Sequence, residues 1–169
     1  GVRGLRIGWS PDFGSAAVDP EVLQATQKAA DVFRELGANV EPAGLEIDIS
    51  ALQRLYDTIN NVSHYMAYGW AFEEHPAMLM DYVHTNIKTG KAVTGAQYAM
   101  ATSELAQHRL KVEAYFDDFD LLLTPTLAVP AFPCGQRPVV IGGKDVSSKG
   151  HYPFTFAFNM SGNPAASVP

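Results

Sequence analysis

The side chains that could act as nucleophiles in this 169-residue sequence lack the local context that catalysis needs. A serine nucleophile requires a base within hydrogen-bond reach, and no motif surrounds either His151 or Ser161. Cys134 lies between a proline and a glycine, and the sequence places no histidine to activate its thiol. We therefore interpret His151 as a loop histidine. A hydrolytic His151–Ser161 pair stays as an alternative, which requires the two side chains to meet in the fold.

Established catalytic and phosphate-binding motifs are also absent. The sequence has no G-x-S-x-G, no phosphate-binding glycine loop, no G-x-G-x-x-G and no H-E-x-x-H. One acidic and histidine-containing stretch has the right residue types for metal ligands, but its spacing matches no known site and is typical of a solvated helix face. We predict neither a metal nor a cofactor. The residues of that stretch are Glu73, Glu74, His75, Asp81 and His84.

The composition is that of a globular protein, with 47% hydrophobic and 18% charged residues. A net charge of −6 argues against a nucleic-acid partner, because the phosphate backbone would be repelled. No apolar run reaches the roughly 18 residues of a membrane-spanning helix, and no signal peptide opens the sequence. A lone cysteine fits a reducing compartment, so we expect a cytoplasmic protein without a membrane partner.

The first 42 residues predict a strand–helix–strand unit. Leu5–Trp9 alternates as a strand does, and Asn39–Pro42 has the composition of a second short strand. Between them, Asp19 can cap a helix that has Pro20 at its first position, and Gly37 can end it. Such units usually contain parallel strands, which indicates an α/β fold.

Helical patterns fill the middle of the chain. Apolar spacing predicts a long helix over Ile49–Glu74 and a short one over Met78–Ile87 that is closed by Lys88–Gly90. A capping box at Thr94–Gln97 predicts the start of a third helix, which continues to about Phe116.

A third strand is predicted at Leu121–Leu123, whose continuous apolar residues are typical of a central strand covered on both faces. Thr124-Pro125-Thr126 follows at the carboxyl end, where open α/β sheets bind ligands. Residues 128–150 are rich in proline and glycine and predict a long loop.

The final stretch, Pro153–Pro169, combines aromatic residues with a turn signal at Asn159–Pro164. Ala165–Val168 are small and mostly apolar, as in a strand buried on both faces. We interpret Pro153–Pro169 as an internal strand-and-pocket segment, and we expect the chain to be part of a longer protein.

Four segments together resemble the C-terminal part of the amidase signature family. The resemblance implies a single α/β unit over residues 1–169, with a mixed, mainly parallel sheet flanked by helices, as a partial amidase signature fold. The segments, in order, are LRIGWSPDFG, VDPEV, FDDFDLLLTPTLAVPAFPCG and PFTFAFNMSGNPAASVP.

Enzymes of that family hydrolyse or transfer amides with a serine nucleophile, a second serine in a cis peptide, and a lysine. These three lie in a more N-terminal region with a Gly-Ser-Ser-Gly-Gly type of stretch, which this sequence lacks. The resemblance therefore assigns no catalytic residue to this chain. It implies a fragment of an amidase that is inactive alone and needs the missing N-terminal half. In the whole enzyme, a small carboxylic amide would be hydrolysed by acyl transfer to a serine outside the chain.

The resemblance and the strand ends together indicate one wall of a substrate pocket. The residues that we expect nearest the amide substrate are Thr124, Thr126, Leu127, Phe158 and Asn159. The structural alternative is that Thr124 and Thr126 cap a strand and Phe158 belongs to the core.

Two other functions stay open. The family includes the amide-transferring component of a tRNA-dependent amidotransferase, whose members usually carry an Arg-rich Gly-Thr-Tyr stretch; Ile87–Thr94 does not resemble it. The second open function is that of a non-catalytic binding or interaction domain with this fold. For a fragment, we also expect self-association through exposed sheet surface.

Overall fold

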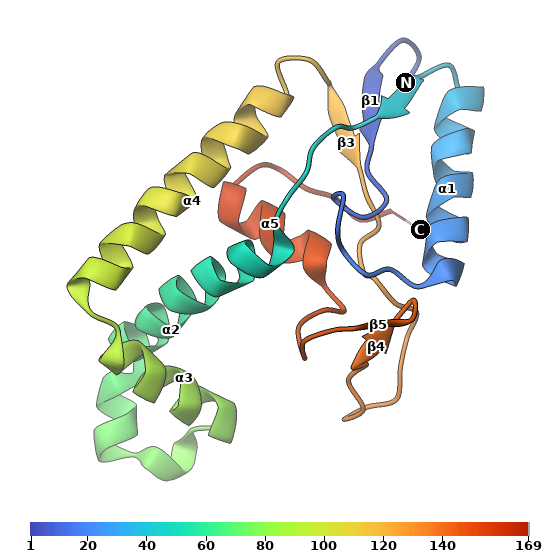
Figure 1. Cartoon of the computed structure of the whole chain (residues 1–169). Coiled ribbons are helices and arrows are strands. Elements are labelled where there is room, and N and C mark those ends of the chain that lie inside the picture. Colours follow the sequence, from blue (N-terminus) through green and yellow to red (C-terminus); the bar gives the residue numbers. More distant parts are fainter. Residues whose placement is uncertain (169) are drawn as a thin grey trace. The chain divides into compact units, whose positions relative to one another are not determined.

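The computed structural model of the chain describes residues 1–168 (Figure 1). Its contacts group into two compact units. The sheet unit comprises Gly1–Ile49 and the described residues from Arg109 onward. The helical unit comprises Ser50–His108. Each unit has its own architecture.

The sheet unit contains three parallel strands in the order β2-β1-β3 (Figure 1). The strand–helix–strand prediction is confirmed, because α1 connects the parallel strands β1 and β2. The fold is therefore the expected mixed α/β type. The strands are β1 (Arg6–Trp9), β2 (Asn39–Pro42) and β3 (Leu121–Leu123), and the helix is α1 (Pro20–Glu35).

β3 differs from its prediction as a covered central strand. Among the residues described, it pairs only with β1 and forms an edge of the sheet. The Leu121 side chain is 44% exposed. The central strand is β1, whose Ile7 is 1% exposed. An apolar triplet indicates the strand but not its place in the sheet.

Helix α1 begins as the local signals predict. The Asp19 side chain accepts a hydrogen bond from the backbone N–H of Glu21 at 2.8 Å, and Pro20 occupies the first turn. At the other end, Gly37 adopts a φ of 90°, a left-handed conformation that glycine tolerates at a helix end.

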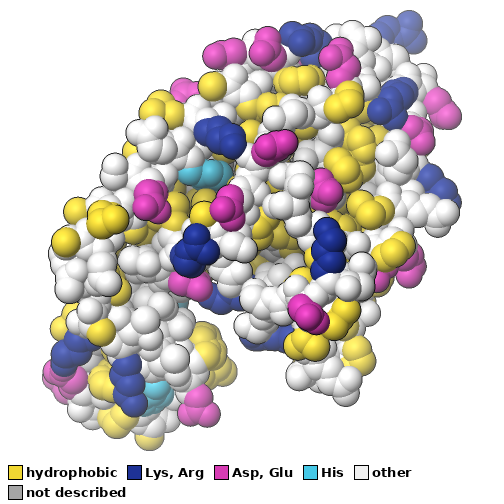
Figure 2. All heavy atoms as spheres, in the orientation of Figure 1, with side chains coloured by type: hydrophobic (Ala, Val, Ile, Leu, Met, Phe, Trp, Pro, Cys, Tyr) yellow, Lys and Arg dark blue, Asp and Glu magenta, His cyan; other side chains and the backbone are white. Residues whose placement is uncertain are grey.

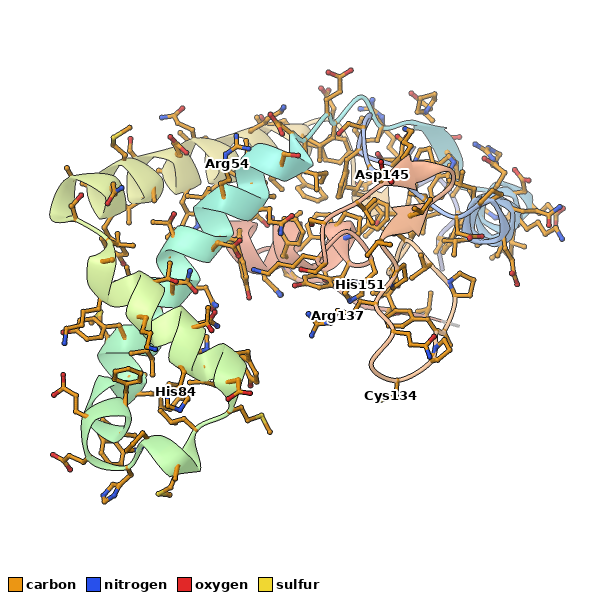
Figure 3. The ribbon with its side chains drawn as sticks, turned by 60° about the horizontal axis from the view of Figure 1, so that its bottom comes forward. Arg54, His84, Cys134, Arg137, Asp145 and His151 are labelled. Atoms are coloured by element: carbon orange, nitrogen blue, oxygen red, sulfur yellow. The ribbon has the colours of Figure 1, made fainter. Side chains whose placement is uncertain are left out.

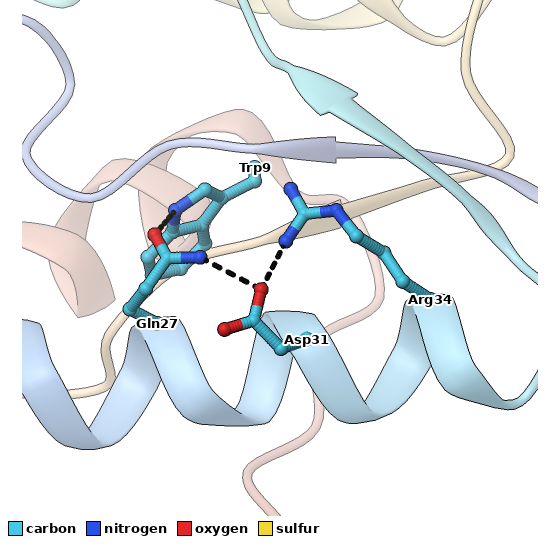
Figure 4. Close-up of polar contacts among 4 residues, drawn as sticks. All are labelled: Trp9, Gln27, Asp31 and Arg34. Carbon is cyan, nitrogen blue, oxygen red and sulfur yellow. Dashed lines mark hydrogen bonds and ion pairs between the residues drawn. The ribbon is translucent and has the colours of Figure 1, made fainter.

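A chain of polar contacts joins β1 to α1 (Figure 4). The indole N–H of Trp9 donates to Gln27 Oε1 at 3.0 Å, and Gln27 Nε2 donates to Asp31 Oδ1 at 3.1 Å. Arg34 then pairs with the same Asp31 oxygen at 2.5 Å. These contacts satisfy the polar atom of a buried tryptophan, which lets its ring pack under the helix.

The close approach of Tyr115 to β1 explains why position 8 is a glycine. A Cβ atom on Gly8 would collide with the Tyr115 hydroxyl and would lie 3.2 Å from Ala43 Cα. The Tyr115 ring stacks on Phe119 with a centroid distance of 4.8 Å. Its hydroxyl is buried without a hydrogen-bond partner among residues 1–168, and burial raises the pKa of Tyr115 to about 12.

The helical unit contains α3 and the 3-10 helix η1 entirely, together with most of α2 and the first part of α4. The prediction that Gly90 closes a helix over Met78–Ile87 is wrong: the helix begins at Asp81 and continues past Gly90. A Cβ at Gly90 would collide with the backbone of Asn61, so this glycine permits close helix packing and is not a stop signal. The elements are α2 (Ile49–Glu74), η1 (Pro76–Met78), α3 (Asp81–Ala92) and α4 (Gly95–Tyr115).

The capping box before α4 is confirmed. The backbone N–H of Thr94 donates to Gln97 Oε1 at 2.8 Å, and the backbone N–H of Gln97 donates to Thr94 Oγ1 at 3.2 Å. This reciprocal pair fixes the first turn of α4.

The helical unit exposes large apolar side chains. Figure 2 shows apolar side chains interspersed with charged ones on the face that it presents. No helix in the described part of the chain is long and apolar enough to cross a membrane. The exposed residues of this unit include Met66, Tyr68, Trp70, Met78, Met80 and Tyr82.

Pro153–Ser161 forms a helix, and the strand expected in the last stretch is absent from the described residues up to Val168. Helix α5 (Pro153–Ser161) begins with its proline in the first turn and ends at Gly162, which has a φ of 85°. Ala165–Val168 were expected to form a buried strand, but these residues are exposed and form no strand. The turn signal was real, but the aromatic residues before it bury their side chains on a helix. Pro169 lies outside the described residues.

The predicted loop over residues 128–150 contains a small hairpin. β4 (Val140–Ile141) and β5 (Lys144–Asp145) pair in the antiparallel sense. Gly142 and Gly143 both have positive φ values, as a tight two-residue hairpin turn requires.

Substitutions at the Gly8–Tyr115 contact test this packing. We expect Gly8→Ala to lower the free energy of unfolding by about 1–3 kcal/mol, because the added methyl group overpacks β1. Tyr115→Phe should change it by less than about 1 kcal/mol, because the hydroxyl has no partner to lose. Urea denaturation of both variants measures this. A Gly8→Ala chain as stable as the unmodified one would contradict the close approach.

Candidate functional site

The carboxyl ends of the three parallel strands meet at one edge of the sheet unit. Trp9 is in register with Pro42 on one side and with Leu123 on the other. Backbone hydrogen bonds continue past the strands, from Ser10 N to Leu123 O at 3.0 Å and from Ala43 N to Trp9 O at 2.9 Å. Open α/β sheets bind ligands at such an edge. We call it the carboxyl edge.

The predicted residues after β3 lie at this edge with polar and apolar groups exposed. Thr124 is half-buried, and its hydroxyl donates to the Pro125 carbonyl at 3.0 Å. Thr126 is exposed, and its hydroxyl shares a hydrogen bond with that of Ser167 at 2.9 Å. The Leu127 side chain is 42% exposed. This segment can therefore offer a hydroxyl and an apolar surface to a ligand.

The next residue, Ala128, anchors the segment. Its N–H donates to the carbonyl of His151 at 3.0 Å, and its own carbonyl accepts from Asp19 N at 2.8 Å. Ala128 is fully buried. The end of the exposed segment is thereby tied to the start of α1 and to the residues that precede α5.

The other two predicted residues lie near the C-terminal end of α5. Phe158 is half-buried and Asn159 is exposed, whereas the following Met160 is buried. The Met160 carbonyl accepts a hydrogen bond from Arg109 Nε at 3.0 Å, and the Phe158 carbonyl accepts one from Gly162 N at 2.9 Å. These contacts fix the helix end that presents both side chains.

Phe13, in the loop after β1, was not predicted as a site residue. Its ring centroid lies 5.1 Å from that of Phe154 and 5.9 Å from that of Phe158. Sequence reasoning took its neighbours Asp12 and Gly14 only as breakers. The signal that could have identified it is a large aromatic residue placed between two turn formers.

The five predicted residues thus form two groups, both in the sheet unit. Within residues 1–168, no hydrogen bond or ring contact joins Thr124, Thr126 or Leu127 directly to Phe158 or Asn159. The loop after β1 links the groups, because Ser10 bonds to the end of β3 and Phe13 contacts α5. We name the five residues the acyl wall, for the role proposed below.

The alternative His151–Ser161 pair is ruled out by α5 itself. The helix runs between the two residues and, at 1.5 Å per residue, separates them by roughly 13 Å. The Ser161 hydroxyl instead donates to the Phe158 carbonyl at 3.2 Å. Cys134 is a free, exposed cysteine.

The acidic and histidine-containing stretch of the helical unit forms other contacts. Glu73 pairs with Lys91 at 3.2 Å, and His84 Nε2 donates to the carbonyl of Pro76 at 2.9 Å. Across the residues that the structure describes, no three His, Cys, Asp or Glu side chains gather closely enough to hold a metal ion.

His151, whose carbonyl anchors Ala128, has an unusual environment for an ionisable side chain. Its ring packs edge-on against Phe132 at 5.3 Å and Tyr152 at 4.6 Å, and its Nδ1 is buried without a hydrogen-bond partner in the described structure. Figure 3 shows Arg137 close to this ring. Burial, and then the Arg137 charge, lower the pKa of His151, while a backbone group of Ser148 acts in the opposite direction.

Comparison with known families assigns the chain. The sequence profile of the Amidase family matches residues 2–169. The chain belongs to the amidase family. An acylamidase of Rhodococcus erythropolis is 30% identical over 173 residues, which cover 99% of this chain and 36% of that protein. A glutamyl-tRNA(Gln) amidotransferase component from Bdellovibrio bacteriovorus is 25% identical over 198 residues, which cover 99% and 39%.

Solved structures of amidases share the fold. A bacterial aryl acylamidase of the amidase signature enzymes matches with a TM-score of 0.77 and 28% identity, over 96% of this chain and 36% of that one. The 6-aminohexanoate cyclic dimer hydrolase, in complex with substrate, matches with a TM-score of 0.75 and 26% identity, over 96% and 37%. The fold expected from the sequence is therefore confirmed as that of amidase signature enzymes.

This amidase chain spans 36–40% of the length of the curated relatives that it matches. More than half of each relative therefore lies outside the matched region.

The environment of His151 predicts a pH dependence of stability. Because its folded pKa lies below the ordinary value of about 6.5, the unfolded chain binds more protons in the interval between the two values. The free energy of unfolding should therefore fall as pH drops through this interval and level off below it. His151→Phe should remove this component of the slope.

Urea denaturation midpoints measured between pH 5 and pH 8 test this. His75→Phe, which changes an exposed histidine of the helical unit, is the matched control and should keep the slope. An identical slope in the His151→Phe and unmodified chains would show that His151 does not cause it.

Proposed function

We propose that this chain is the C-terminal part of an amide hydrolase and contributes one wall of its substrate pocket. The observation that supports the proposal most is the position of Thr126 and Leu127. In a chain matched by the Amidase family over residues 2–169, both are exposed just after β3, at the carboxyl edge of a parallel sheet. Parallel sheets of this type bind their ligands at that edge.

The reaction proposed for the whole enzyme is acyl transfer to a serine that lies outside this chain. The serine oxygen forms a bond to the amide carbonyl carbon, and backbone N–H groups stabilise the oxyanion. The C–N bond then breaks, and the amine leaves with a proton. Water next attacks the acyl-enzyme ester, which releases the carboxylic acid and restores the serine hydroxyl.

The acyl wall would bind the substrate without taking part in bond breaking. Leu127 and the half-buried ring of Phe158 offer apolar surface to the acyl group. The exposed Thr126 hydroxyl and the Asn159 amide can form hydrogen bonds with the polar atoms of an amide. Small-molecule pockets are typically lined by apolar side chains together with a small number of polar groups.

The relatives favour a hydrolase as the first candidate, ahead of an amidotransferase component. The acylamidase reaches 30% identity, against 25–27% for amidotransferase components from several bacteria. We also propose a cytoplasmic location, which the presence of a single cysteine, Cys134, in this sequence supports.

Activity measurements test the proposed role of this chain. We expect the 169-residue chain alone to hydrolyse no amide, and the full-length protein that contains it to hydrolyse propionamide or acetanilide. In the full-length protein, Leu127→Asp should raise KM by about tenfold or more, because a carboxylate would be desolvated against the acyl group. The measurement is the rate of amine or ammonia release.

Leu110→Asp, at an exposed position of α4, is the matched control and should leave KM unchanged. Hydrolysis by the purified chain alone, with contamination excluded, would contradict the assignment of the nucleophile to the rest of the protein. Equal KM values for Leu127→Asp and the unmodified enzyme would remove Leu127 from the pocket.

The exposed edge at β3 supports the expectation of self-association. Unpaired strand edges and exposed apolar side chains such as Leu121 favour pairing with another chain. We expect the 169-residue chain to show a concentration-dependent increase in mass by light scattering. Leu121→Lys should reduce that increase, since lysine on an edge strand opposes pairing. A monomer of constant mass over a wide concentration range would refute the expectation.

A further inference from the structure

We propose that Phe13 is a positioning residue that sets the shape of the acyl wall by holding the ring of Phe158. This inference rests on the proposed amide-hydrolase function. According to this inference, the buried loop after β1 determines the selectivity of the enzyme between aromatic and short aliphatic acyl groups.

The backbone at Phe13 is held in a costly conformation. Of the residues that the structure describes, it is the only non-glycine residue with a positive φ, which is 52°. For a bulky residue this left-handed conformation is unfavourable, and it persists only where surrounding contacts enforce it. Phe13 is also 0% exposed, so its own side chain cannot contact a ligand directly.

The contacts that enforce this conformation come from both sides of the residue. The Phe13 N–H donates to the buried hydroxyl of Ser10 at 3.1 Å, and the Phe13 carbonyl accepts from Ile47 N at 3.1 Å. Asp12 closes a turn beside it, because its side chain accepts from Gly14 N at 2.8 Å. The loop is therefore fixed between β1 and the segment that follows β2.

This conformation directs the Phe13 ring against α5. The ring meets Phe154 at a centroid distance of 5.1 Å and an interplanar angle of 50°. It meets Phe158 at 5.9 Å and 62°, an edge-to-face arrangement. Phe158 is half-buried, so the residue stays partly accessible while its ring rests on Phe13. The position of the accessible part depends on what supports the buried part.

The same loop is bonded to the strand that leads to the other half of the acyl wall. Ser10 accepts from Phe13 through its side chain and donates through its backbone N–H to Leu123 O. Thr124 follows Leu123 directly. Phe13 thus lies on the covalent and hydrogen-bonded path between the two groups of wall residues, which fixes where the Phe158 ring lies relative to the strand end.

A planar aromatic acyl group would gain more binding than a short alkyl group from a Phe158 ring that is held in one orientation. Aromatic rings prefer edge-to-face or offset contacts of defined geometry, whereas a short alkyl chain makes non-directional contacts. Replacing Phe13 by leucine keeps an apolar residue but removes the ring edge that supports Phe158. The freed Phe158 ring could then turn into the vacated space, and the wall would lose its defined aromatic face.

The test compares benzamide with propionamide in the full-length amidase that contains this chain. Phe13→Leu should lower the ratio of kcat/KM for benzamide to that for propionamide by roughly threefold to tenfold, the size expected for one aromatic contact. The change should appear as a raised KM for benzamide, with kcat for propionamide unchanged. Phe72→Leu, a half-buried aromatic of the helical unit, is the matched control and should leave the ratio unchanged.

Phe158→Leu keeps the proposal testable if Phe13→Leu does not fold. It should lower the same ratio, and the double variant should lower it no further than Phe158→Leu alone, because Phe13 acts through Phe158. An unchanged ratio in Phe158→Leu, or additive effects in the double variant, would overturn the inference. Loss of folded protein in Phe13→Leu would lower the rates for both substrates equally and leave their ratio unchanged, and the ratio measured for Phe158→Leu then decides.

The two proposals fail differently. If the unmodified full-length protein hydrolyses neither amide, the proposed function fails and the inference falls with it. If it hydrolyses both amides and a folded Phe13→Leu variant leaves their ratio unchanged, the proposed function stands and the positioning role of Phe13 is refuted.

Discussion

The parallel pairing of β1 with strands on both sides is the constraint on which the sheet unit depends. It brings together chain segments that are far apart in the sequence, and it forces the residues after all three strands to one edge. The sheet unit requires a small residue at position 8, because Tyr115 packs directly on that position of β1. It also requires a way to bury Trp9, which the polar contacts with Gln27 provide. Substitution at either position therefore acts on the whole carboxyl edge.

Three attachments then fix α5 to this edge. The backbone of Ala128 holds the residues before the helix, Phe13 supports its middle, and Arg109 bonds to its C-terminal end. Two buried polar atoms lack partners in the described structure, the Tyr115 hydroxyl and His151 Nδ1, and both lie among aromatic rings. In each case burial disfavours the charged form, which raises the pKa of Tyr115 and lowers that of His151.

Local signals were sufficient where short-range chemistry decides the structure. The Asp19 cap and the Thr94–Gln97 capping box lie where their spacing predicts, because their hydrogen bonds form between near neighbours in the chain. The prediction for Gly90 was wrong because its role depends on Asn61, a residue of another helix. The strand predicted at Ala165–Val168 failed because composition does not reveal whether a second layer covers the segment.

The acyl wall shows the same division. Thr124, Thr126 and Leu127 could be named in advance, because they follow a recognisable strand and parallel strands place their carboxyl ends together. Their contact with a substrate stays a prediction. Phe13 could not be named, since its left-handed backbone and its contact with Phe158 appear only when the loop after β1 meets α5.

A strained, fully buried phenylalanine also has an explanation that stability alone does not supply. Glycine at position 13 would adopt the same backbone conformation without strain, and the chain already uses glycine at the adjacent position 14. What glycine cannot provide is the ring that supports Phe158. Burial of the Phe13 ring stabilises the core, but an apolar side chain at a position with an ordinary backbone conformation would stabilise it as much. The feature specific to Phe13 is the direction in which its side chain points, toward α5, where its ring contacts both Phe154 and Phe158. Strain and direction together therefore indicate a positioning role for Phe13, because either one without the other is compatible with simple core packing.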